Sequence, residues 1–199
     1  DELIKVDNFI KNSLNSNIKL INDVNKYITY NKGKRLRPTI LLLISKACKY
    51  KGNNHISSAA IIELIHTATL LHDDVIDESL IRRNQSTVNN KWNNKSAILV
   101  GDFLYSRAFQ IMVKIKNINI LKILSNSTNT LSEGEILQLM QKKNFNINEN
   151  NYLKIIHYKT ATLFQAAANI GSLLSNNTQH LSKNISKYGF HLGIIYQLI

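Results

Sequence analysis

The sequence predicts an all-α protein. Of its 199 residues, 44% are hydrophobic, whereas one is proline and seven are glycine, so turn-forming residues are scarce. Apolar residues recur at helical spacing through most of the chain. A chain of this length can bury a substantial core, and no composition shift or fixed-period repeat divides it. We therefore expect one helical domain over residues 1–199.

Apolar spacing and breaking residues together place the expected helices in chain order. The predicted ranges are 2–29, 38–50, 57–79, 95–114, 117–141, 149–173 and 181–199. Polar stretches between these ranges are rich in asparagine and are expected to form loops. These stretches are Asn53-Asn54, Asn89 to Asn94, Asn144 to Asn151 and Asn176-Asn177.

The most informative segment is acidic and reads Leu71-His72-Asp73-Asp74-Val75-Ile76-Asp77-Glu78. On a helix, Asp73 and Asp77 lie one turn apart on the same face, and His66 lies nearly in line with them. Magnesium prefers hard oxygen ligands and keeps several waters, so one or two carboxylates and the phosphate oxygens of a substrate complete its shell. Asp73 and Asp77 are therefore predicted to bind Mg²⁺, although an acidic cluster alone is more often a solvated helix face.

Basic residues flank the acidic segment on both sides. Arg82 and Arg83 follow it, and Lys34 and Arg37 lie upstream in the loop Lys32-Gly33-Lys34-Arg35-Leu36-Arg37-Pro38. Proline suits the first turn of a helix, and the unpaired N–H groups of a helix start attract anions. Taken alone, the loop is most simply a solvated basic segment. Beside an acidic metal site, it completes what a diphosphate requires.

These segments resemble the trans-type isoprenyl diphosphate synthases, also called polyprenyl synthases, and in particular their long-chain, octaprenyl-like branch. Further matches are Leu64 to Leu70, Gly101-Asp102-Phe103-Leu104, Glu133 to Leu139, Lys159-Thr160-Ala161 and Gly193 to Gln197. Their order and spacing agree with the family over nearly the whole chain. The resemblance implies an isoprenoid-synthase-type helical bundle with a central active-site cavity.

The resemblance also implies a role for each site residue. The residues implied to hold isopentenyl diphosphate are Lys34, Arg37, His66 and Arg83. Those implied to contact the allylic diphosphate are Arg82, Lys159, Thr160 and Gln197. The implied metal ligands are Asp73 and Asp77, which would bind Mg²⁺ on the allylic diphosphate, with Asp74 supporting the cluster.

The implied reaction needs no nucleophilic side chain. The allylic carbon–oxygen bond ionises, diphosphate leaves, and the double bond of isopentenyl diphosphate attacks the cation. Magnesium, Arg82 and Lys159 would stabilise the leaving anion in a site that excludes water, so these residues and the three aspartates are the expected catalytic residues. The departing diphosphate is the expected base.

Product length is expected to depend on Ala68 and Thr69, which lie just upstream of the aspartates. In the family, bulky aromatic residues at these positions stop the chain early. The small residues here predict elongation of farnesyl or geranylgeranyl diphosphate to a long all-trans polyprenyl diphosphate, which would serve as a quinone side chain. The family also implies a homodimer, and the helices after Gly101 are apolar enough to supply its interface, although the same residues could be ordinary core.

Charge and cysteine content limit the other possibilities. Lysine and arginine number 25 against 13 acidic residues, a formal net charge of +12. The basic residues are scattered and not gathered with aromatic ones, so we expect no specific nucleic-acid binding but an attraction for diphosphates or a membrane surface, with peripheral association for a long product. Cys48 is the single cysteine, which excludes an internal disulfide. We expect an intracellular protein, and the compartment stays unknown. The chain begins at Asp1 without a methionine, which is compatible with removal of a targeting segment for an organelle such as a mitochondrion or plastid.

Three alternatives remain open. A terpene cyclase also uses an aspartate-rich helix, but it needs no isopentenyl site. A noncatalytic subunit of a heteromeric prenyl synthase would share the fold, and a basic helical nucleic-acid binder would share the charge. The family also has a second aspartate-rich motif after the position of Gln197, whereas this sequence ends at Ile199. We therefore expect an incomplete C-terminus and little condensation activity from the 199 residues alone.

Overall fold

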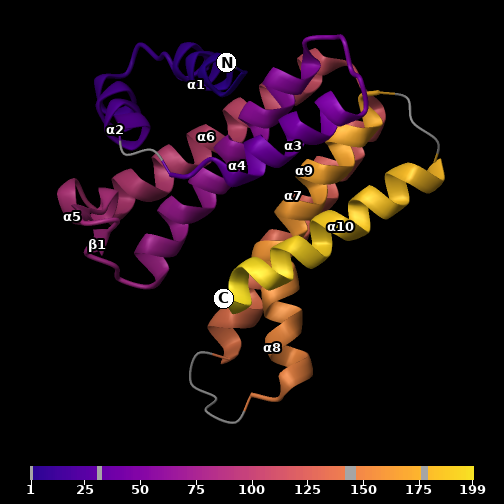
Figure 1. Cartoon of the computed structure of the whole chain (residues 1–199). Coiled ribbons are helices and arrows are strands. Elements are labelled where there is room, and N and C mark those ends of the chain that lie inside the picture. The colour runs from indigo at the N-terminus through magenta and orange to yellow at the C-terminus, as the bar shows by residue number, and fades with distance from the viewer. Residues whose placement is uncertain (1, 31–32, 142–146, 176–178) are drawn as a thin grey trace.

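Two long helices, α4 (Asn54–Ile76) and α6 (Asn94–Ile115), pack side by side along their length. The computed structural model describes residues 2–30, 33–141, 147–175 and 179–199, and these residues are helical apart from loops and one small hairpin (Figure 1). The predicted all-α class is confirmed. None of the described helices is both long and apolar enough to cross a membrane.

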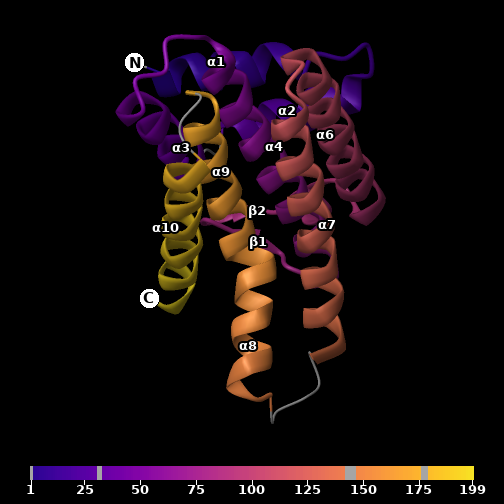
Figure 2. The ribbon, with the colours of Figure 1, turned by 90° about the vertical axis from the view of Figure 1, so that its right-hand side faces the viewer.

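The other elements surround this pair. Before α4 come α1 (Glu2–Ser13), α2 (Lys19–Tyr30) and α3 (Leu36–Ala47). Between α4 and α6 lie strands β1 (Ile81–Arg82) and β2 (Gln85–Ser86) and the short helix α5 (Val88–Lys91). After α6 come α7 (Ile118–Gln141), α8 (Glu149–Ile156), the π-helical segment η1 (His157–Ala161), α9 (Thr162–Leu173) and α10 (Gln179–Leu198). In Figure 2, α8 and the end of α7 extend beyond the rest of the bundle.

Helix α4 lies at the centre of the hydrophobic core, to which several other helices also contribute. Every residue from Ser58 to Ile65 is buried, which explains why its apolar positions run together and do not form one stripe. Small residues such as Ala59 and Ala68 are fully buried there and let neighbouring helices approach closely. Each fully buried isoleucine or leucine contributes about 1.5–3 kcal/mol to folding. The core therefore fixes α4, and with it the acidic segment at its C-terminal end.

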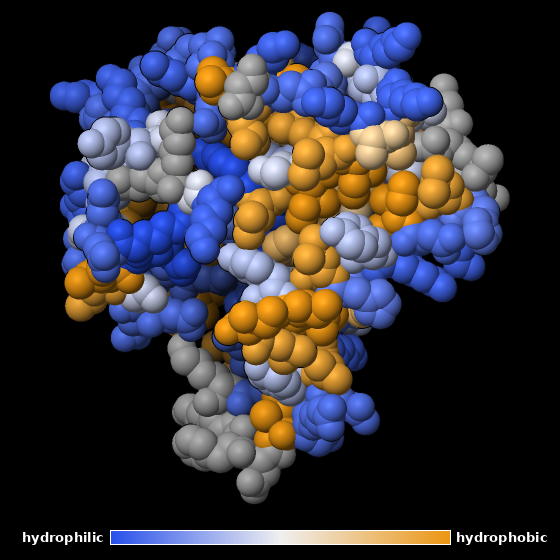
Figure 3. Space-filling view, in the orientation of Figure 1, coloured by the Kyte–Doolittle hydropathy of each residue, from blue (hydrophilic) through white to orange (hydrophobic). Residues whose placement is uncertain are grey.

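Apolar side chains also gather on the face shown in Figure 3, over α3, α9 and α10. Leu43 on α3 and Leu181, Ile195 and Leu198 on α10 are exposed large hydrophobic residues.

The helix predicted over residues 2–29 was wrong as a single element, because α1 ends at Ser13 and α2 begins at Lys19. Two asparagine side chains of α2 stabilise the connection. Asn22 accepts from the N–H of Ser16 (3.1 Å) and donates to its carbonyl, while Asn25 donates to the carbonyl of Leu14 (3.0 Å). Such side-chain bonds to the backbone compete with a continuous helix.

Two other ranges also differ from prediction. The range 149–173 is helical throughout but contains η1, where the backbone widens by one residue. The asparagine-rich loop at 89–94 instead holds part of α5 and the cap of α6, where Asn93 accepts from the N–H of Ser96 (2.8 Å). Asn148 caps α8 in the same way, with Asn151 as donor (2.8 Å). Residues 142–146 and 176–178 of the expected loops lie outside the described residues.

Candidate active site

A cavity of about 610 Å³ opens between α4, α7, α8, η1 and α10. Most of the residues that the sequence singled out lie on its wall, although they come from distant parts of the chain. They are Arg37, His66, Thr69, Asp73, Arg82, Arg83, Lys159, Thr160 and Gln197. The wall also carries Glu135, Gln138 and Tyr196, to which sequence reasoning gave no role. All three lie within motifs that resemble the family. Their position in these motifs is the sequence signal that could have identified them.

A second hollow, of about 400 Å³, adjoins this cavity and shares Arg37, His66, Arg83 and Tyr196 with it. Lys34 lies on the wall of this second hollow. The guanidinium of Arg83 lies against Gly33, where an added Cβ would come within 2.5 Å of Nη2. The structure therefore brings together the four residues expected to hold isopentenyl diphosphate.

Arg37 and His66 are in direct contact within this group. Nη1 of Arg37 lies 3.2 Å from Nε2 of His66, and because a guanidinium can only donate, Nε2 must accept and the imidazole is neutral. Burial, reinforced by the nearby arginines, lowers the pKa of His66 well below its ordinary value. Burial also lowers the pKa of Arg37 to about 10, against the opposing charge of Glu63. In the described part of the chain, Nε of Arg37 is buried without a hydrogen-bond partner, as expected of a donor awaiting an anion.

Elsewhere on the cavity wall, Lys159 lies between two carboxylates. Its Nζ is 2.7 Å from Oε2 of Glu135 and 3.6 Å from Oδ1 of Asp73. Burial and a hydrogen bond with Asp73 raise the pKa of Glu135 to about 7, although Lys159 acts in the opposite direction. Glu135 is therefore partly protonated near neutral pH, beside the ammonium group of Lys159.

The π-helical segment η1 carries both Lys159 and Thr160, and two glycines let other helices approach it. At Gly134 on α7, a Cβ would come within 2.7 Å of Tyr158. At Gly193 on α10, a Cβ would come within 2.5 Å of the Cα of Ala161. The hydroxyl of Thr160 donates to Oε1 of Gln197 on α10 (2.9 Å). These contacts hold the three residues expected to contact the allylic diphosphate from this side.

Asp74 does not face the main cavity with Asp73. Its side chain is buried and accepts from both Nε and Nη2 of Arg82, each at 2.8 Å. Burial raises the pKa of Asp74, and Arg82 offsets part of that effect. Arg82 ends β1, and the hairpin turn that follows has positive φ at both Arg83 (51°) and Asn84 (60°), as a type I′ turn requires. The hairpin thus directs Arg82 to Asp74 near the end of α4 and Arg83 to Gly33.

The predicted helix over 57–79 ends earlier than expected, at Ile76, so Asp77 is the C-cap residue. Its N–H still donates to the carbonyl of Asp73 (2.8 Å), which keeps the two carboxylates one turn apart. Glu78 then takes a left-handed conformation (φ 51°) that ends the helix.

The described residues hold no group of three or more metal-ligating side chains. Asp73 on the cavity wall (17% exposed) and the exposed Asp77 one turn later supply one or two hard oxygen ligands. That donor set fits Mg²⁺, which takes the remainder of its shell from water and substrate phosphates. It does not suit an ion that needs a complete protein cage.

The two residues expected to limit product length differ in their surroundings. Thr69 lies on the cavity wall, and its hydroxyl donates to the carbonyl of His66 (2.8 Å). Ala68 is fully buried in the core and is not among the described residues on that wall.

Comparison with known sequences places these features in a family. Residues 18–199 match the family model for polyprenyl synthetase. The octaprenyl diphosphate synthase of Escherichia coli is 46% identical over 190 residues, which are 96% of this chain and 59% of that protein. The all-trans-nonaprenyl-diphosphate synthase (geranyl-diphosphate specific) of Rhodobacter capsulatus is 40% identical over 195 residues, 98% of this chain and 60% of that protein.

Solved structures agree. A decaprenyl diphosphate synthase from Rhodobacter capsulatus superposes with a TM-score of 0.95 at 39% identity, over 98% of this chain and 61% of that one. A polyprenyl synthase from Caulobacter crescentus CB15, complexed with calcium and isoprenyl diphosphate, gives 0.96 at 36% identity, over 99% and 60%. The chain thus spans about 60% of the length of these relatives. With a match to the family model over residues 18–199, the chain belongs to the polyprenyl synthetase family.

Proposed function

We propose that the protein is a trans-polyprenyl diphosphate synthase that joins isopentenyl diphosphate to an allylic diphosphate and makes a long-chain all-trans product. One observation carries the proposal: a single cavity is lined by a contacting pair, Asp73 and Lys159, and by a separate basic group, Arg37, His66 and Arg83. Two diphosphates need two such groups of residues. The octaprenyl and nonaprenyl synthases among its relatives support a long product.

The isopentenyl diphosphate lies against the basic group. Lys34, Arg37 and Arg83 supply charge, and the buried Nε of Arg37 finds its acceptor in a phosphate oxygen. Because His66 is neutral with its proton on Nδ1, it orients the guanidinium of Arg37 and adds no further charge to a site that is already strongly basic.

The allylic diphosphate lies against Asp73, Lys159, Thr160 and Gln197. Asp73 and Asp77 would hold Mg²⁺, which when bound would supply charge stabilisation for the leaving diphosphate. The allylic carbon–oxygen bond breaks with its electrons on diphosphate, the isopentenyl double bond forms the new carbon–carbon bond, and the adjacent carbon loses a proton to the diphosphate. Lys159 stabilises charge on the leaving oxygen, while Arg82, fixed by Asp74, does so from the hairpin.

Two assembly properties complete the proposal. The protein forms a homodimer, and exposed apolar residues of α6, Leu99 (65% exposed) and Val113 (67% exposed), are available for its interface. A long hydrocarbon product and a net charge of +12 favour peripheral association with an anionic membrane surface.

The test is a magnesium-dependent assay with labelled isopentenyl diphosphate and farnesyl or geranylgeranyl diphosphate, with products resolved by chain length. The protein is assayed at its natural length and as these 199 residues, and we expect long prenyl diphosphates from the former. A cyclic hydrocarbon would indicate a terpene cyclase instead. Turnover that appears only after a second subunit is added would indicate a noncatalytic partner.

A further inference from the structure

Arg35 has an unusual backbone conformation at the start of α3. Its φ of 51° and ψ of 34° place it in the left-handed region, which a long side chain seldom adopts. Its carbonyl accepts from both the N–H (2.9 Å) and the hydroxyl (2.7 Å) of Thr39, so this conformation sets where α3 begins. Lys34 precedes Arg35 and Arg37 follows two residues later, so the same conformation sets the direction of both.

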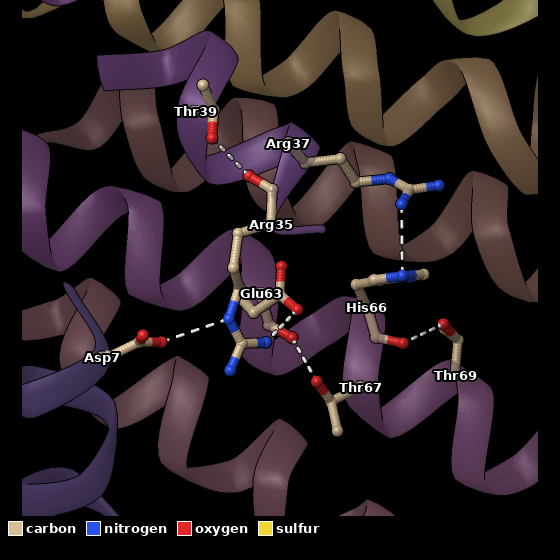
Figure 4. A network of polar contacts seen from close by, with 8 residues as sticks. All are labelled: Asp7, Arg35, Arg37, Thr39, Glu63, His66, Thr67 and Thr69. Carbon is tan, nitrogen blue, oxygen red and sulfur yellow. Dashed lines mark hydrogen bonds and ion pairs between the residues drawn. The ribbon is translucent and has the colours of Figure 1, made fainter. Parts of the chain in front are cut away.

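The side chain of Arg35 points away from that of Arg37, as Figure 4 shows. Its guanidinium lies between Glu63 on α4, which it contacts through Nη1, and Asp7 on α1, whose Oδ1 is 3.2 Å from Nε. Only 12% of the Arg35 side chain and 8% of the Glu63 side chain are exposed. Two carboxylates on different helices thus hold one fork-shaped cation, a geometry that fixes orientation as well as charge.

The carboxylate of Glu63 also offsets the positive charge of the isopentenyl half of the site. It lies on the wall of the hollow that holds Lys34, Arg37 and Arg83. Cations this close repel one another when no anion is bound, and a buried carboxylate between them lets them remain in place. Asp7 adds a second negative charge, and it does so from α1, which precedes the residues matched by the family model.

We propose that Arg35, held by Asp7 and Glu63, is a positioning residue that orients the loop carrying Lys34 and Arg37 for isopentenyl diphosphate. Arg35 also lines the hollow that holds Lys34 and Arg37, but its guanidinium is turned to Asp7 and Glu63. The inference rests on the proposed function, because it assigns Arg35 to the isopentenyl half of that site. A purely structural role, in which the network only ties α1 to the bundle, would change stability without distinguishing the two substrates.

The experiment measures calorimetric affinity for isopentenyl diphosphate, and separately for geranylgeranyl diphosphate with Mg²⁺, in the full 199-residue chain. Arg35→Lys keeps the charge and removes the fork, and we expect roughly a tenfold weaker affinity for isopentenyl diphosphate. Asp7→Asn removes one of the two anchors and should weaken it by roughly threefold. Affinity for the allylic diphosphate should stay within about twofold in both variants.

Glu2→Gln is the matched control, because Glu2 also joins α1 to α4, through His55 (3.0 Å), but far along α4 from the cavity. It should lower the unfolding midpoint and leave both affinities unchanged. The inference would be overturned if Arg35→Lys and Asp7→Asn bound isopentenyl diphosphate as tightly as the unchanged protein does. It would also be overturned if both variants lost affinity for the two diphosphates to the same extent. Failure of the unchanged protein to bind isopentenyl diphosphate would instead reject the proposed function. In both variants at natural length, the Michaelis constant for isopentenyl diphosphate should rise while that for the allylic diphosphate stays the same. If Arg35→Lys folds poorly, the measurements on Asp7→Asn test the inference.

Discussion

Asp73 and Asp74 are neighbours in the sequence but act on different sides of α4. Successive residues of a helix point about 100° apart, so Asp73 contacts Lys159 on the cavity wall while Asp74 turns to Arg82. The sequence grouped them in one acidic cluster, and helical spacing correctly paired Asp73 with Asp77. It could not predict that Asp74 would be buried beside an arginine, because that contact depends on the hairpin that follows.

Replacing Asp73 by asparagine should abolish Mg²⁺-dependent binding of the allylic diphosphate and leave the fold intact. The carboxylate faces a cavity and not the core, so we expect the unfolding midpoint to stay within a few degrees. Calorimetry with and without Mg²⁺ measures the effect, and circular dichroism checks the fold. Asp23→Asn, which makes the same change on α2, is the control. Magnesium-dependent binding equal to that of the unchanged protein would disprove the metal assignment.

Acidification should destabilise the protein through His66. Burial lowers its pKa in the folded state, so between that value and about 6.5 the unfolded chain binds the proton and the folded chain does not. The stability from His66 is therefore fully present above about pH 6.5 and is lost as the pH falls below it. The raised pKa of Glu135 acts in the opposite direction between about pH 4.5 and 7, so the comparison must be between variants.

The measurement is urea unfolding without metal at about pH 7.5 and about pH 5.5. The loss of unfolding free energy on acidification should be smaller in His66→Gln than in the unchanged protein, by on the order of 1 kcal/mol. His180→Gln, at an exposed position of α10, should show the full loss. An equal loss in His66→Gln would show that His66 is not held neutral by the fold.

At the scale of elements, apolar periodicity predicted the long helices but neither the π-helical turn within one of them nor the hairpin between two of them. A single extra residue at η1 leaves the apolar pattern of 149–173 nearly unchanged, so no signal separates a π-helical turn from an α-helical one. The hairpin strands have two residues each, too few to show a period. Asn84 suits a turn with positive φ, but an arginine at position 83 has no such preference. The contact of the Arg83 guanidinium with Gly33, and not the conformational propensity of arginine, accounts for its place in the turn.

Replacing Gly193 by alanine should displace η1 and weaken binding of the allylic diphosphate. The new Cβ would come within 2.5 Å of the Cα of Ala161, which is backbone and cannot move aside cheaply. We expect a loss of about 1–3 kcal/mol in unfolding free energy and weaker allylic affinity, with isopentenyl affinity retained. Gly52→Ala is the control, since its Cβ would meet the end of the flexible Tyr50 side chain. Unchanged allylic affinity in Gly193→Ala would show that the position of η1 does not control that half of the site.

At the scale of the whole molecule, the cavity is the part of the site that the sequence predicted least. The order of motifs indicated which residues belong together, and nine of them do share one wall. Lys159, however, contacts Glu135, a residue to which the sequence assigned no role, because this contact depends on how α7 packs against η1. The depth of the cavity depends on side chains from four or more elements and follows from no single motif.

Thr69 should therefore limit product length more directly than Ala68. Thr69 lies on the cavity wall, and phenylalanine there would fill space that a growing chain needs, so Thr69→Phe should shift products to shorter lengths at nearly unchanged stability. Ala68 is fully buried, and Ala68→Phe should first overpack the core, at a cost of about 1–3 kcal/mol. Chromatography of the products at natural length, beside urea unfolding of both variants, separates the effects. Thr69→Ser, which keeps the hydroxyl and adds no bulk, should leave the product distribution unchanged. Unaltered products from Thr69→Phe would mean that the growing chain passes along another wall of the cavity.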